Sequence, residues 1–105
     1  MPLRIVIEPA ARLDIEDQFK YLTERHPEAA LRFYDAANDI FVKLAETPGI
    51  GTIWETHNPA LLGVRRFPVP GFVKYLIFYR TTQTELRIVR ILHGARNIRR
   101  ILEAN

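Results

Sequence analysis

The most restrictive feature of this sequence is a run of three strand-like segments on very short connections. They cover residues 61–69, 71–81 and 85–93, and each is rich in β-branched and aromatic residues. The sequences between them, "PG" and "TTQT", are both typical of turns. A connection this short has no room for a crossover helix, so consecutive strands must run antiparallel. We therefore predict an antiparallel meander in the second half of the chain.

The first half of the chain shows helical periodicity instead. One helix is predicted from Pro9 to about Arg25, and a second begins at Pro27 and ends before "ETPGIG". Because the break between them is short, we expect an antiparallel helical hairpin. The predicted core positions are Ala11, Ile15, Phe19 and Leu22 in the first helix and Ala30, Phe33, Ala37, Ile40, Phe41 and Leu44 in the second.

The order of elements predicts an α+β fold. A short strand at 3–7 precedes the hairpin, and the meander follows a loop at 49–61, which gives β-α-α-β-β-β. A last helix at 96–105 would place Ile98, Ile101, Leu102 and Asn105 on its apolar side. We expect a single domain, 1–105, with two layers in which the hairpin packs on the antiparallel sheet. The first strand or the 61–69 strand is expected to offer a free sheet edge.

The composition excludes several kinds of active site. The chain has no cysteine and no serine, which rules out thiolate nucleophiles and Ser-His-Asp catalysis. His26, His57 and His93 are far apart and lack a nearby carboxylate at metal-ligand spacing, so neither a metal nor a cofactor is expected. "GIGTIW" at 49–54 lacks the third glycine of a dinucleotide fingerprint, and we interpret its Trp54 as a partly buried anchor.

Charge is divided unevenly along the chain. Residues 1–64 contain six Lys/Arg and ten Asp/Glu, whereas residues 65–105 contain nine and two. This pattern indicates that the second half faces a polyanion, either nucleic acid or an acidic protein segment, or else that the cations only solvate a surface. No apolar run is long enough for a signal peptide core or a membrane span, so we expect a cytoplasmic protein with no membrane partner.

The end of the chain, "RILHGARNIRRIL", concentrates the candidate functional residues. Arginine makes bidentate hydrogen bonds to phosphate or carboxylate and stays charged at any physiological pH. The candidate target-binding residues are His93, Arg96, Arg99 and Arg100. A metal-free RNA-cleaving site could use such cations to stabilise a phosphorane, with His93 transferring protons. His93 could equally donate one structural hydrogen bond at the end of its strand.

Five segments spread along the chain form a familiar combination: "AARLDIEDQFKYL", "KLAETPGIG", "GVRRFPV", "YLIFYR" and "VRILHGARN". Together they resemble the toxins of the ParE/RelE superfamily from bacterial type II toxin–antitoxin modules, over essentially the whole chain. The resemblance implies a toxin that is neutralised by a cognate antitoxin in a hetero-oligomer. RelE-like members are ribosome-dependent endonucleases of messenger RNA, and ParE-like members are associated with inhibition of DNA gyrase.

The resemblance also implies which branch fits better. The arginine after the last strand of RelE-like enzymes matches Arg96, but their central-strand arginine falls near Leu76 and their terminal tyrosine near Leu102. "ILHGARN" is similar to the ParE branch, so gyrase is the favoured target and no catalytic residue is expected. The alternatives are an endoribonuclease that binds ribosome and messenger RNA, and a degenerate toxin that binds only antitoxin. The nuclease would use Arg96 and His93 with Arg65, Arg66 or Lys74.

Overall fold

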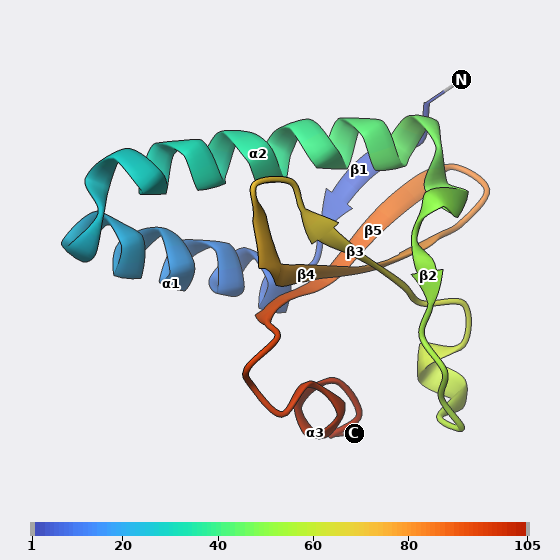
Figure 1. The fold of residues 1–105 in the computed structure, drawn as a ribbon. Helices are drawn as coiled ribbons and strands as arrows, with labels where there is room; N and C mark the ends of the chain where they lie inside the picture. Colours follow the sequence, from blue (N-terminus) through green and yellow to red (C-terminus); the bar gives the residue numbers. More distant parts are fainter. Residues whose placement is uncertain (1, 105) are drawn as a thin grey trace.

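The computed structural model describes residues 2–104 and contains the predicted order of elements (Figure 1). The strands are β1 (Arg4–Ile7), β2 (Thr52–Ile53), β3 (Arg65–Val69), β4 (Phe72–Thr81) and β5 (Glu85–His93). The helices are α1 (Pro9–Arg25), α2 (Pro27–Glu46) and α3 (Ile98–Leu102), with short 3-10 turns at Pro48–Ile50 and Pro59–Leu61. The predicted α+β class is therefore confirmed, and both long helices begin at a proline, as expected.

All five strands form one sheet in the order β1-β5-β4-β3-β2. Strands β3, β4 and β5 pair antiparallel in sequence order, which confirms the predicted meander. β1 pairs parallel with β5, so the first and last strands of the chain are neighbours in the sheet. The helical hairpin is part of the long connection that parallel pairing requires.

The structure corrects two details of the predicted strands. The strand predicted at 61–69 begins only at Arg65, because Pro59–Leu61 forms a 3-10 turn. Its edge is partly covered, since Thr52 and Ile53 of β2 pair with Arg66 and Arg65. β1 lies at a sheet edge, as predicted, and β2 lies at the other.

The hairpin packs on one face of the sheet and forms the main core. Ala11 and Leu22 of α1 are buried, Ile15 and Phe19 pack against them, and all six predicted positions of α2 are buried. The sheet contributes six buried side chains to this cluster: Val69, Ile77, Tyr79, Leu86, Ile88 and Ile91. The predicted packing of the hairpin on the sheet is thus confirmed at the level of individual residues.

A second, smaller apolar cluster lies on the opposite face of the sheet, where α3 lies below the sheet in Figure 1. Leu102, Ile98 and Ile101 of α3 pack there on Phe78 and Leu92, beside the segment that contains Trp54. α3 is shorter than predicted and begins after Asn97, whose side chain accepts a hydrogen bond from the Arg100 amide at 3.2 Å. Asn105, predicted on its apolar side, lies outside the described residues. Neither α1, α2 nor α3 is long and apolar enough to cross a membrane.

Candidate functional site

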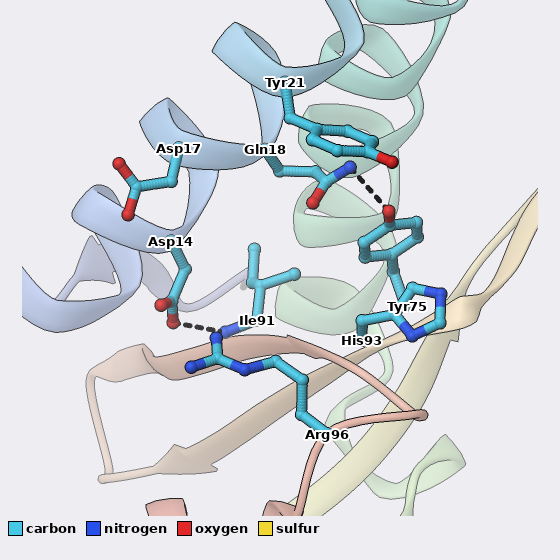
Figure 2. A pocket seen from close by; sticks show the side chains of 8 residues that line it. All are labelled: Asp14, Asp17, Gln18, Tyr21, Tyr75, Ile91, His93 and Arg96. Atoms are coloured by element: carbon cyan, nitrogen blue, oxygen red, sulfur yellow. Dashed lines mark hydrogen bonds between the residues drawn. The ribbon is translucent and has the colours of Figure 1, made fainter.

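A polar pocket lies between α1 and the adjoining ends of β4 and β5 (Figure 2). Its volume is about 420 Å³. It includes two of the candidate residues, His93 and Arg96, and six that the sequence analysis did not single out for function. The lining residues are Asp14, Asp17, Gln18, Tyr21, Tyr75, Ile91, His93 and Arg96.

Asp14 fixes the α1 wall of this pocket to β5. Its carboxylate accepts two hydrogen bonds from the Arg90 guanidinium, at 2.7 and 2.9 Å, and one from the Ile91 amide at 3.0 Å. The hydrogen bonds from Asp14 raise the pKa of Arg90. Arg90 reaches Asp14 next to a β-bulge, where the pairing shifts so that Val89 has no partner on β4. Asp14 is therefore a structural residue of the pocket.

Tyr75 and His93 form the sheet side of the pocket. They are direct partners across β4 and β5, and their rings meet edge to face with centroids 4.8 Å apart. Gln18 donates a hydrogen bond of 2.5 Å to the Tyr75 hydroxyl (Figure 2). Burial is the main cause that raises the pKa of Tyr75. Nearby Tyr21 raises this pKa further, and the hydrogen bond from Gln18 lowers it. Tyr75 is therefore a neutral phenol at physiological pH.

His93 is held by the loop that follows β5. Its Nδ1 accepts a hydrogen bond of 2.9 Å from the Ala95 amide, and its carbonyl accepts one of 3.0 Å from the Arg96 amide. The Gly94 amide donates to the Lys74 carbonyl at 2.7 Å, which ties the same loop to β4. His93 therefore makes a structural hydrogen bond at the end of its strand, but its ring accepts this bond and does not donate it as predicted. The Arg96 guanidinium forms no ion pair with any residue in 2–104.

The structure does not bring all four candidate target-binding residues to one pocket. The Arg99 guanidinium lies 4.5 Å from the ring centroid of Trp54, on the α3 side of the sheet, and is paired with Glu103. Arg100 is exposed on α3, and no ion pair of its side chain occurs within the described part of the chain. His93 and Arg96 thus line the pocket, whereas Arg99 and Arg100 belong to the neighbouring surface.

The five residues assigned to a possible nuclease are also dispersed. Arg65 lies opposite buried Tyr79 in the register of β3 and β4, on the hairpin side of the sheet. Its guanidinium donates a hydrogen bond of 2.7 Å to the Gly51 carbonyl. Arg66 lies opposite Phe78 in the same register, and Phe78 belongs to the apolar cluster on the α3 side of the sheet. Lys74 is exposed near the loop that holds His93 and Arg96. The described residues therefore show no single cavity that contains the set.

Most of the pocket could have been found from the sequence. Asp14 and Gln18 are four residues apart on α1, and so are Asp17 and Tyr21, so all four share one helix face. Tyr75 could not have been added, because its place opposite His93 depends on the register of β4 and β5. Among residues 2–104 there is no group of three or more His, Asp or Glu side chains that could hold a metal ion.

Glu103 holds α3 against the segment around Trp54, and this contact predicts a pH dependence. The Thr56 hydroxyl is the main cause that lowers the pKa of Glu103, followed by the charge of Arg99. A carboxylate with a lowered pKa stabilises the folded state above its ordinary pKa and loses that contribution as the pH falls through the lowered value. We expect the fluorescence of Trp54, the single tryptophan, to change as the pH falls from the ordinary pKa of a glutamate through the lowered pKa of Glu103. The far-UV circular dichroism should be retained over the same range.

Glu103→Gln is the matching variant, because it should show the altered Trp54 emission at neutral pH and no acidic transition. Glu85→Gln is the control, since the pKa of Glu85 is also lowered, by Arg4 and Arg87, but at the β1 edge. A transition that persists in Glu103→Gln would contradict the assignment.

Comparison with known proteins gives a family and several similar solved structures. Residues 5–98 match the family described as ParE toxin of type II toxin-antitoxin system, parDE. The chromosomal ParDE system from P. aeruginosa has a TM-score of 0.69 and 18% identity, over 87% of this chain and 95% of that chain. The complex RelBE2 from Mycobacterium tuberculosis has a TM-score of 0.58 and 20% identity, over 89% of this chain and 99% of that chain. No curated protein sequence matches the chain.

Proposed function

Because this chain belongs to the ParE toxin family of type II toxin–antitoxin systems, we propose that it stops growth by binding and inhibiting DNA gyrase. A cognate antitoxin neutralises it in a hetero-oligomeric complex in the cytoplasm. The two similar structures come from a ParDE system and a toxin–antitoxin complex, which supports an antitoxin partner. His93, Arg96, Arg99 and Arg100 are the proposed contacts with the target.

The positions of Leu76 and Leu102 support inhibition by binding over RNA cleavage. They occupy the places where the resemblance puts the strand arginine and the terminal tyrosine of RelE-like nucleases. Leu102 is buried and Leu76 packs against the same cluster, which α3 covers. A leucine has no group that could stabilise a phosphorane or transfer a proton, so these two positions are structural here.

Expression without antitoxin, combined with assays of the purified toxin, tests the proposal. We expect arrested growth, inhibited supercoiling by gyrase and accumulated gyrase–DNA cleavage complexes. Messages cut at the ribosomal A site, with gyrase unaffected, would instead establish the endoribonuclease. Normal growth would indicate a degenerate toxin that retains only antitoxin binding.

Single substitutions locate the contacts in the same assays. Arg96→Ala and Arg100→Ala remove exposed charges that make no ion pair within residues 2–104, and we expect about tenfold weaker gyrase inhibition from each. Arg12→Ala is the matched control, because Arg12 is an exposed cation on α1 and is not one of the proposed contacts. Equal losses in all three variants would refute the assignment.

A further inference from the structure

We propose that five cations on β3, β4, α3 and the loop before α3 form a binding surface for the phosphate backbone of duplex DNA. This basic band consists of Arg66, Lys74, Arg96, Arg99 and Arg100. The inference deepens the proposed function, because it assigns part of the target surface to the DNA on which gyrase acts.

The band is continuous through contacts on the surface. Arg66 and Arg99 line one cavity beside Trp54, and Arg100 follows Arg99 on α3. The Asn97 cap links α3 to the loop that carries Arg96. The Gly94 amide of that loop binds the Lys74 carbonyl at 2.7 Å. The elements that carry the five cations are therefore neighbours in the fold.

The charges of the band are largely uncompensated. Arg66, Lys74, Arg96 and Arg100 form no ion pair with another described residue, and only Arg99 is paired, with Glu103. Residues 65–105 have two acidic side chains, those of Glu85 and Glu103, and both are already engaged with arginines. From the first half, Glu55 lies beside Arg66 and Arg99, and Asp17 lines the pocket of Arg96 together with Asp14, which is paired with Arg90. Within residues 2–104, the four cations without an ion pair thus outnumber the two unpaired carboxylates beside them.

The polarity of the outer face of α3 favours DNA over a protein partner. The apolar side chains of α3, Ile98, Ile101 and Leu102, are turned to the sheet, so the helix presents Arg99 and Arg100 to solvent. Protein interfaces normally have an apolar centre, whereas a phosphate backbone is bound by exposed cations without one. The outer face of the helical hairpin differs from that of α3, because Leu13, Leu31 and Val42 are more than half exposed there. Beside the band, Ile53 is the aliphatic residue that lines the cavity of Arg66 and Arg99, and it is 48% exposed.

The salt dependence of DNA binding gives a quantitative test without gyrase. We would measure fluorescence anisotropy of a labelled duplex of about 20 base pairs with the full-length toxin over a series of salt concentrations. Release of counterions from about four phosphates predicts a slope of log K against log salt of roughly −3 to −4. Arg66→Gln and Arg100→Gln should each make this slope less negative by about 0.9, with unchanged circular dichroism.

Matched controls distinguish a local surface from general charge. Arg12→Gln and Lys20→Gln on α1 remove the same charge from the hairpin, so the slope should stay as in the wild type. Equal flattening by all four variants, or no binding at low salt, would overturn the inference. Tighter binding of a single-stranded RNA of the same sequence would also overturn it. Gyrase inhibition without DNA binding would refute the band alone, and DNA binding without gyrase inhibition would refute the proposed function alone.

Discussion

Replacing Gly51 with alanine lowers the free energy of unfolding by about 2–4 kcal/mol, because the added methyl group has no space. A Cβ at this position would collide with the Tyr79 hydroxyl and lie 2.9 Å from the Arg66 carbonyl oxygen. The fully buried Tyr79 hydroxyl accepts a hydrogen bond from the Gly51 amide at 2.9 Å and donates one to the Pro48 carbonyl at 2.7 Å. Urea unfolding followed by circular dichroism would measure the loss.

Gly49→Ala is the matched control in the same segment. A Cβ on Gly49 would meet no atom within 4 Å, so we expect a change of about 0.5 kcal/mol or less. Tyr79→Phe removes the hydroxyl that the new methyl group would strike, and the double variant with Gly51→Ala should therefore lose less stability than the sum of the two single variants. Strict additivity would show that Gly51 is not confined by Tyr79.

Asp14→Asn is expected to cost about 2–3 kcal/mol of stability, because it leaves the Arg90 guanidinium without its counter-charge. Only 9% of the Asp14 side chain and 23% of the Arg90 side chain are exposed, so water replaces the lost ion pair poorly. The same carboxylate also binds the Ile91 amide. Thermal or urea unfolding would measure the effect, and binding of the target should weaken because α1 is no longer fixed to β5.

Asp17→Asn, one turn along α1, provides the comparison. Asp17 lines the same pocket but is exposed and forms no ion pair within residues 2–104, so we expect at most about 0.5 kcal/mol. A double-mutant cycle between Asp14→Ala and Arg90→Ala should give a coupling energy of about 1–3 kcal/mol. Equal losses from Asp14→Asn and Asp17→Asn would mean that the contact with Arg90 contributes nothing.

Local signals predicted the elements well. The prolines at 9 and 27 mark the starts of α1 and α2. All six core positions that the apolar spacing predicted in α2 are buried. The two-residue strand β2 could not be predicted, because it exists only through pairing with Arg65 and Arg66. α3 was predicted too long, since local periodicity does not show where packing on the sheet ends.

The candidate site was predicted less completely than the fold. His93 and Arg96 do line a pocket together. Arg99 was grouped with them from its place in the sequence, but the face of α3 on which it lies directs it to Trp54. The sequence also suggested that His93 could act in proton transfer or support the loop, and the Ala95 amide uses its Nδ1 for the second purpose.

The sequence by itself determined the α+β class, the helical hairpin, the meander and the concentration of cations in the second half, because each follows from residues close together in the chain. Only the tertiary structure placed β1 beside β5, brought Asp14 to Arg90 and set Tyr79 against Gly51. These contacts join residues 28 to 81 positions apart. They depend on strand register, a β-bulge and the burial of side chains around one sheet, and no local pattern in the sequence records these features.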